Sequence, residues 1–551
     1  MAAWWPAFVL ALASIWVVQP MHDVNWWQSH ENIWYPVRVH EYLLSWDAGV
    51  WYPRWCPNFY GGYGYPFLNY YAPGVYFFGA LISRIASVDP FAALKLLVTL
   101  ATMTSSFGVY GLLRSETRRT DAALLGAACY VFLPYRCTDL FARGDLAEYC
   151  AYCVVPFVVW SYRALARSSG RRAALIACAA ALSHACVLLS HTLLGMLTTD
   201  LVGLYAVALC LRKQHRIALL AGAAMLFGIA IASVYLLPAF AERNLVFIER
   251  VTDGNYVPWQ RFVPLGSLLD PFYTPGWAFF LGLAGWLASL AVPRARRAAI
   301  ASAIPWLVAV AMLVVSFPHI VLIWKVIPFG GKVQFAWRLL GYVGLFTALG
   351  IAIWWAQLVP PRWYAMVAAI VLCLPMPALL SAQRRVVLEP VVPMTDAQIR
   401  ATFATSTAMD EYLPRRVGHA PPGPVTRPAW GDDVSVRVAG RQLDGLHHEV
   451  EIDTPGPSRV TVPVFGFRGW QVRTLEGPVP AELRVDKDDG LVRVLVPKAG
   501  HYKVVVYFGQ VWFRVFAAVL SVLALLALYP VLALLAWRLS PAGPATALAA
   551  G

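Results

Sequence analysis

The sequence has few charged residues: Asp, Glu, Lys and Arg make up 13% of its 551 residues, whereas hydrophobic residues make up 59%. A soluble domain of average composition carries about 25% charged residues, so this composition excludes that class. The net charge of +14 does not indicate a nucleic-acid-binding protein, because the basic residues fall in short clusters between apolar runs. Such clusters are typical of the cytoplasmic loops of a polytopic membrane protein.

Other familiar signals are missing as well. The nine cysteines, an odd number, lie mostly inside apolar runs, so we expect neither a disulfide scaffold nor a zinc site. The glycines around Tyr63 do not form a dinucleotide fingerprint, because no strand and helix flank them. The N-terminus lacks the basic segment of a cleaved signal, so we expect residues 3–18 to be retained as a membrane helix. We find no internal repeat.

Hydropathy and charge predict about twelve membrane-spanning helices with both termini in the cytoplasm. Residues 73–88 are apolar, but a span there would place the arginines at 114–119 on the wrong face. We therefore expect residues 73–88 to form a re-entrant or surface-lying segment. The spans are expected near residues 3–18, 91–113, 121–134, 150–164, 173–190, 194–211, 217–237, 276–292, 298–316, 338–357, 363–381 and 511–537.

Residues 382–510 differ in character from the rest of the chain. They are polar and then alternate between apolar and polar residues, as in 435–438, 459–465, 470–474, 491–496 and 502–507. Period-two alternation between turns predicts a small antiparallel β-sandwich. The predicted fold is thus a polytopic α-helical membrane protein with a small all-β domain before the last helix. We divide it into residues 1–381, including a long first loop at 19–90, then 382–510, and a last helix with its tail at 511–551.

The first loop, from Met21 to Tyr71, contains acids, histidines, arginines and many aromatic residues. Asp23 follows the first helix, where a partly desolvated carboxylate suits a general base. A helix-end cap is the alternative for Asp23. A short helix from Pro36 to Trp46 would place Arg38 and Glu41 one turn apart, so we expect those two to form a local ion pair.

The loop after the third span, Tyr135 to Tyr149, is also rich in acids. It holds Arg136, Asp139, Arg143, Asp145 and Glu148, whose acids could bind a divalent metal or the hydroxyl groups of a sugar. The alternative is that Arg143 and Asp139, or Arg143 and Asp145, neutralise one another. His191, at the outer end of its helix, is a further candidate, whereas His184 is expected in the core.

Cations at the membrane surface form the third group of candidates. Arg338, at the mouth of a span, offers a bidentate fork for a lipid phosphate, although arginines at such positions also extend to the interface without a ligand. Arg54, beside a tight glycine turn, is the second phosphate candidate.

Several motifs run along nearly the whole chain. They are His22-Asp23, GxxYPRW at 49–55, GYGYPFLNYYAP at 62–73, PYR with RGDLAE at 134–148, His191, QFAWR at 334–338, EYLP at 411–414, and the β domain before the last helix. Together they resemble the GT-C superfamily of polytopic glycosyltransferases. More narrowly, they resemble the bacterial membrane proteins described as 6-pyruvoyl-tetrahydropterin synthase-related.

This resemblance implies an inverting glycosyltransferase of the bacterial inner membrane, with its active site facing the periplasm. It would move a sugar from a polyprenyl-phosphate donor to a periplasmic glycan, lipid or protein acceptor, and it would not bind nucleic acid. Asp23 is the expected base, and Arg338 and Arg54 are expected to bind the donor phosphate. Substrate contacts are expected from His30, Glu31, Tyr63, Arg143, Asp145, Glu148, His191, Gln334 and Trp337. No metal is assigned, and the cofactor is left open. A catalytically silent scaffold and a transporter or flippase of lipid-linked glycans are the alternatives.

Overall fold

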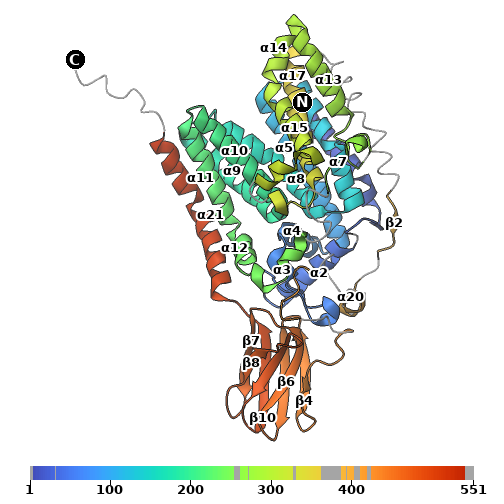
Figure 1. Ribbon diagram of the computed structural model, residues 1–551, viewed down its shortest axis with the longest axis vertical. Helices are drawn as coiled ribbons and strands as arrows, with labels where there is room; N and C mark the ends of the chain where they lie inside the picture. Colours follow the sequence, from blue (N-terminus) through green and yellow to red (C-terminus); the bar gives the residue numbers. More distant parts are fainter. Residues whose placement is uncertain are drawn as a thin grey trace, which may run out of the picture.

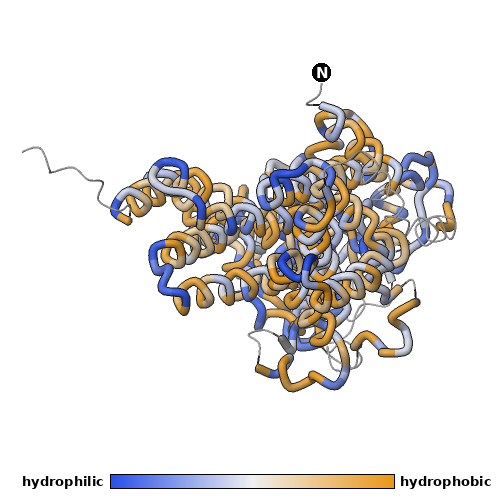
Figure 2. The backbone as a smooth tube through the Cα atoms, turned by 90° about the horizontal axis from the view of Figure 1, so that it is seen from above, coloured by the Kyte–Doolittle hydropathy of each residue, from blue (hydrophilic) through white to orange (hydrophobic). Residues whose placement is uncertain are grey.

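The computed structural model describes residues 4–31, 33–252, 261–270, 272–326, 330–360, 386–391, 394–402, 410–417 and 423–539. It consists of a large helical part and a small β domain at one end of it (Figure 1). Viewed along the helices, hydrophobic residues cover most of the helical part, and hydrophilic residues are grouped in short stretches (Figure 2). This division agrees with the fold class predicted from composition and alternation.

Five helical segments are long and apolar enough to cross a membrane. Two bent pairs, with breaks of 69° and 65°, could each form one more span. The five are α5 (Pro90–Thr117), α9 (Gly170–Ser190), α10 (Thr192–Leu211), Ala336–Leu358, which contains α17 (Leu339–Leu358), and α21 (Trp512–Arg538). The bent pairs are α11 (His215–Ile231) with α12 (Ser233–Ala241), and α14 (Pro293–Ala301) with α15 (Ala303–Val315).

The expected count of twelve spans is therefore not reached among the described residues. Four apolar helices are shorter, namely α1 (Trp5–Val17), α4 (Gly74–Ala86), α6 (Thr120–Val131) and α13 (Trp277–Ala291). Helix α4 has 13 residues, fewer than the roughly 20 that cross a bilayer, a length that suits a surface-lying segment. The expected span at 363–381 lies outside the described residues. Further helices are α2 (Trp34–Asp47), α3 (Phe67–Tyr70), α7 (Pro134–Cys137), α8 (Leu146–Leu165) and the short α16 (Val321–Val326).

Local sequence explains where the long helix α5 begins and ends. The Asp89 carboxylate accepts hydrogen bonds from the backbone N–H groups of Phe91 and Ala92, and Pro90 occupies the first turn of α5. An acceptor at the N-cap followed by proline is the favoured start of a helix. The other end of α5 is closed by Arg118 in the left-handed conformation.

The β domain contains two four-stranded antiparallel sheets, in the orders β4-β5-β10-β7 and β3-β6-β9-β8. Alternate residues such as Val450, Val492 and Val504 are fully buried, which is the period-two pattern expected of a sandwich. The strands are β3 (Trp430–Gly431), β4 (Arg437–Asp444), β5 (His447–Thr454), β6 (Ser458–Phe465), β7 (Trp470–Glu476), β8 (Glu482–Val485), β9 (Leu491–Val496) and β10 (Gly500–Phe508). The predicted small β domain is confirmed.

The first loop fills the space between the helices and the β domain, where α2, α3 and α4 lie (Figure 1). The Trp55 ring packs against the rings of Phe467, Trp470 and Phe508 of the β domain at 5.5–6.0 Å between centroids. The chain before the β domain also crosses this loop: β2 (Leu388–Glu389) pairs with β1 (Trp26–Trp27), and α20 (Asp396–Thr402) lies beside it. The first loop is therefore enclosed rather than free in solution.

A buried charged pair ties the first loop to the last helix. Glu242, fully buried at the end of α12, accepts hydrogen bonds from Arg514 Nε at 3.1 Å and Nη2 at 3.0 Å. The Asn69 side chain also donates to Glu242, at 2.9 Å, and its oxygen accepts from Arg54 at 3.0 Å. Arg514 donates in addition to the Arg468 carbonyl of the β domain. This network joins four separate parts of the chain.

Replacing Arg514 by Met should lower the free energy of unfolding by about 3–5 kcal/mol, because Glu242 would remain buried without its cation. The double replacement Glu242→Met and Arg514→Met should recover a good part of this loss, since no charge of the pair then remains buried. Denaturant unfolding in detergent, followed by tryptophan fluorescence, measures both effects. Arg484→Met is the control, because its pair with Glu482 is about 70% exposed and should contribute less than about 1 kcal/mol. An equally small effect of Arg514→Met would contradict the assignment.

Candidate functional site

The first loop and the loop at residues 135–149, here called the second loop, are hydrogen-bonded to each other beside Gly144. The backbone N–H groups of His30 and Glu31 donate to the carbonyls of Ala142 and Arg143, at 3.1 and 3.0 Å. Gly144 has φ +68°, and a Cβ atom added there would lie 2.1 Å from Ser29 Oγ. Only glycine provides both this backbone conformation and this close approach. The glycine of the RGD sequence therefore sets how the first loop lies against the second.

Gly144 also positions the start of α8. A π-helical turn, Thr138–Arg143, ends at Gly144, and Asp145 then caps α8 by accepting a hydrogen bond from the Glu148 N–H at 3.0 Å. The same oxygen, Oδ1, accepts from the Tyr35 hydroxyl at 2.8 Å. The other oxygen, Oδ2, has longer contacts among the described residues: 3.3 Å to Arg143, 3.8 Å to His191 and 3.9 Å to Arg338.

Glu148 lies fully buried between two arginines. Its Oε1 is 2.9 Å from Arg143 Nη1 and accepts from the Tyr135 hydroxyl at 2.7 Å, while its Oε2 accepts from Arg338 Nε at 2.7 Å. Burial alone would raise the pKa of Glu148, but the two guanidinium groups hold that pKa well below its ordinary value. Arg338 enters from the start of the span Ala336–Leu358, and its carbonyl accepts from the Tyr152 hydroxyl. Glu148 therefore stays ionised and joins the second loop to this helix.

Asp139 is a further carboxyl of this cluster, expected from the sequence only as an acid of this loop and a possible partner of Arg143. It is fully buried and accepts from Arg143 Nη1 at 2.6 Å. Burial and then the charge of Glu148 raise the pKa of Asp139 well above its ordinary value. The spacing of four residues between Asp139 and Arg143 is the signal that predicts this pair.

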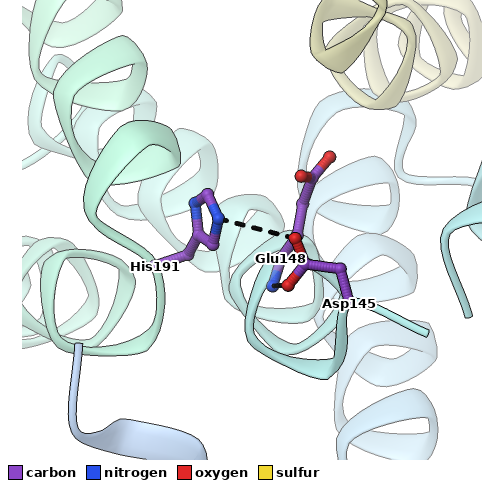
Figure 3. Close-up of side chains that lie close together, drawn as sticks. All are labelled: Asp145, Glu148 and His191. Carbon is purple, nitrogen blue, oxygen red and sulfur yellow. Dashed lines mark hydrogen bonds and ion pairs between the residues drawn. The ribbon is translucent and has the colours of Figure 1, made fainter. Parts of the chain in front are cut away.

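His191 approaches the two acids of α8 from the opposite side, between α9 and α10 (Figure 3). Its Nδ1 accepts the Leu194 N–H at 3.2 Å, and its Nε2 lies 3.8 Å from Asp145 Oδ2. Burial lowers the pKa of His191 to about 4, so the ring is neutral near pH 7. Because Nδ1 accepts a hydrogen bond, the ring proton lies on Nε2 and faces Asp145.

The donor set of this cluster does not suit a metal ion. One atom each of Asp145, Glu148 and His191 lies within 4.8 Å of the others, which is the spacing of a possible metal site. However, both Glu148 oxygens are bonded to arginines, and His191 presents a protonated nitrogen. A metal ligand must offer a lone pair, and two guanidinium groups beside the site would repel a cation. The cluster has the chemistry of a hydrogen-bonded ion network.

The structure brings together most of the candidates around this network. The contacts given above connect Arg143, Asp145, Glu148, His191 and Arg338. The backbone hydrogen bond to Arg143 joins Glu31 to them, and the Glu31 side chain pairs with Arg38. Gln334 adjoins them, since its oxygen accepts from Arg338 at 3.3 Å. Trp337 follows in the chain, and its ring stacks on Phe335 at 4.7 Å.

Four candidates lie elsewhere. Asp23 is exposed, and its carboxylate accepts the Asn25 N–H at 2.8 Å, so no contact among the described residues joins it to the network. The His30 side chain is exposed. Arg54 is buried, and its guanidinium donates to Asn69 and to the Val234 carbonyl. Tyr63 stacks on Phe465 of the β domain at 5.4 Å. The roles assigned to these four remain predictions.

The expected local pair of Arg38 with Glu41 is wrong, although α2 forms where the helix was expected. Arg38 pairs instead with Glu31, at 3.3 Å. Glu41 accepts from the backbone and side-chain nitrogens of Asn58, at 3.1 and 2.8 Å. The spacing rule applies to exposed helices, whereas both residues are buried here, on a helix with neighbours on several sides.

Replacing Gly144 by Ala should destabilise the contact between the two loops. The left-handed backbone costs an alanine about 1–2 kcal/mol, and the clash with Ser29 adds to that cost. Thermal unfolding in detergent should show a lower midpoint. Adding Ser29→Gly should restore part of the loss, because it removes the clash and leaves the backbone cost, and Ser29→Gly alone is the control. A Gly144→Ala midpoint equal to that of the parent would contradict this account.

Removal of divalent metals should leave the fold unchanged. We expect EDTA not to change the midpoint of thermal unfolding, because the donor set is occupied by arginines and by a ring proton. The measurement is thermal unfolding in detergent with EDTA and with added Mg²⁺ or Mn²⁺. A midpoint that falls with EDTA and that either metal restores would contradict the expectation.

Comparison with solved structures finds a likeness to the apo form of the oligosaccharyltransferase of Archaeoglobus fulgidus. The TM-score is 0.48 at 14% identity, over 70% of this chain and 56% of that one. The chain thus spans just over half the length of that protein, and a likeness of this degree carries no inference about activity. No curated protein matches the sequence.

A family model gives the clearer result. It matches residues 68–385, which is more than half of the chain and includes the second loop, His191 and Arg338. Its description names a membrane protein. The chain belongs to the family of the 6-pyruvoyl-tetrahydropterin synthase related domain, a family of membrane proteins.

Proposed function

We propose that this protein is a glycosyltransferase of the GT-C type that uses a polyprenyl-phosphate-linked sugar. In this proposal it resides in the bacterial inner membrane and transfers the sugar, with inversion, to an acceptor on the periplasmic face. One observation carries the proposal: Asp145, Glu148, His191 and Arg338, which come from three distant parts of the chain, meet in one buried network.

The network contains groups suited to both halves of such a donor. Arg338 and Arg143 offer N–H groups for the phosphate, whose negative charge increases as the bond to the sugar breaks. Asp145 Oδ2 has no contact shorter than 3.3 Å among the described residues, so it can accept a sugar hydroxyl without losing a strong bond. His191 Nε2–H can donate to another hydroxyl or to the phosphate.

The position of the site also suits a membrane-bound donor. Arg338 lies at the end of a membrane span, which is the depth at which lipid phosphates lie in a bilayer. The enclosed first loop lies between this level and the β domain (Figure 1). A polyprenyl tail would remain in the bilayer while its phosphate reaches Arg338. An acceptor would enter from the side of the first loop and the β domain. A flippase would instead need ionisable residues near the middle of broken helices.

Consumption of lipid-linked sugars tests this function. Purified protein is incubated with a membrane lipid extract and solubilised cell-envelope glycans, and the polyprenyl-phosphate sugars are followed by mass spectrometry. We expect wild type to consume one of them. Asp145→Asn and Glu148→Gln should lower turnover roughly 10²-fold or more, because each disturbs the groups around the phosphate and sugar. Glu482→Gln, an exposed change in the β domain, is the matched control and should have no effect.

Two results would contradict the proposal. One is that wild type consumes no lipid-linked sugar with any acceptor fraction supplied. The other is that Asp145→Asn and Glu148→Gln consume the donor as fast as wild type. Transbilayer movement of a labelled lipid-linked sugar without its consumption would identify a transporter instead.

A further inference from the structure

Glu31 differs from the other acids of the network in its exposure. Its side chain is 35% exposed, whereas those of Asp139, Asp145 and Glu148 are 0–9% exposed. Its backbone is fixed by the hydrogen bond to Arg143 described above. Glu31 is thus a carboxylate at the rim of the buried network, held in place by the hydrogen bonds beside Gly144.

Within the described part of the chain, the one short contact of the Glu31 carboxylate is with Arg38, whose guanidinium lies in an aromatic cage. Arg38 Cζ lies 4.2 Å from the ring centre of Phe67 and 5.5–5.7 Å from those of Trp34, Tyr35 and Tyr71. Its Nη1 also contacts the Tyr76 hydroxyl, at 3.4 Å. The cage fixes the cation by stacking. Glu31 Oε2 is bonded to it, and no contact of the other oxygen, Oε1, is found among the described residues.

We propose that Glu31 takes the proton from the acceptor and that Arg38 is its positioning residue. This inference rests on the function proposed above. The acceptor oxygen or nitrogen forms its bond to the anomeric carbon as its proton passes to the Glu31 carboxylate. The bond from that carbon to the phosphate oxygen breaks at the same time, and the polyprenyl phosphate leaves with the electron pair. Glu31 then releases the proton to water at its exposed edge.

The other carboxyl groups are less able to do this. Both Glu148 oxygens are held by arginines, and Asp139 is fully buried. Asp145 Oδ1 caps α8, and Oδ2 faces inward, toward His191 and Arg338. Asp23 is exposed but lies apart from the network. Glu31 alone of these groups has both access for an acceptor and a fixed place beside the arginines.

The surroundings of Glu31 suit a base. Burial raises the pKa of Glu31 above its ordinary value, Asp145 adds to that increase, and Arg38 and Arg143 oppose it. The hydroxyls of Tyr35, Tyr71 and Tyr76 are the remaining titratable groups that face it, and all three stay protonated near pH 7. Because only the carboxylate accepts a proton, the rate should rise with pH through the pKa of Glu31.

The test compares variants in the donor-consumption assay. Glu31→Gln should lower kcat roughly 10²- to 10⁴-fold, the usual contribution of a general base, with the KM for the donor changed less than about threefold. Asp47→Asn is the matched control, because Asp47 is an exposed acid of the same loop that pairs with Arg84. If Glu31→Gln does not fold, Glu31→Asp should retain partial activity with the wild-type pH dependence.

Arg38 gives a second measurement that a merely structural role would not change. Arg38→Met removes a cation that lowers the pKa of Glu31, so the acid limb of the kcat profile should move to higher pH. Arg38→Lys retains the charge and should keep that limb close to its wild-type position. Thermal unfolding of each variant confirms that it is folded.

Each outcome decides between the two proposals. Turnover by wild type with an equally active Glu31→Gln would overturn the role of Glu31 and leave the glycosyltransferase standing. Loss of activity in Asp23→Asn together with full activity in Glu31→Gln would return the base to Asp23. An acid limb that is unchanged in Arg38→Met would overturn the positioning role. Absence of turnover by wild type would overturn both proposals.

Discussion

The contact between Glu148 and Arg338 is the interaction on which the site depends. It joins the start of α8 to the start of the span Ala336–Leu358, two elements 190 residues apart in the chain. In a buried environment an ion pair of this kind adds little net stability, but either partner alone is costly. The pair therefore fixes the relative position of two helices, and Arg143 and Asp145 lie beside it.

The β domain and the segment before it complete this arrangement from outside. The first loop is polar and aromatic, and its short helices α2, α3 and α4 are joined by irregular segments. It is enclosed by the helices on one side and by Trp55 contacts to the β domain on the other. The Glu242–Arg514 pair attaches the same loop to α21 through Asn69. The fold thus uses its last domain to order its first loop, which carries Glu31 to the network.

Sequence reasoning predicted the parts of this protein that depend on local patterns. Apolar runs located the long helices, and alternation located β6, β7, β9 and β10, because burial on one face has a regular period. The strand β5 was missed, since its His447, His448 and Glu449 hide the alternation. The number of spans was not predictable to the same degree. Bent pairs such as α11 with α12 read as one apolar run, and short helices such as α6 read as complete spans.

Most residues of the site could be predicted from the sequence, but the pairs that they form could not. The second loop, His191 and Arg338 were found because charged residues at the ends of apolar runs are conspicuous. Which acid meets which arginine depends on contacts between distant segments, so Arg38 was assigned to Glu41 although it pairs with Glu31. Asp23 was favoured by its position after the first helix, whereas the structure brings a different acid of the same loop to the network. Only tertiary contacts, such as the approach of Ser29 to Gly144, distinguish these two acids.

The charges of the network fit a reaction that moves a proton and a negative charge in opposite directions. The carboxyl groups of Glu31, Asp139, Asp145 and Glu148 face three guanidinium groups, those of Arg38, Arg143 and Arg338, and burial together with the charge of Glu148 raises the pKa of Asp139. Glycosyl transfer as proposed creates one negative charge on the phosphate and neutralises one at Glu31, so the total charge of the enclosed site stays constant. A buried site pays heavily for a change in net charge and much less for its displacement over a few ångströms. In the proposed reaction, the proton acceptor at the rim and the phosphate beside Arg338 are therefore the two ends of one balanced system.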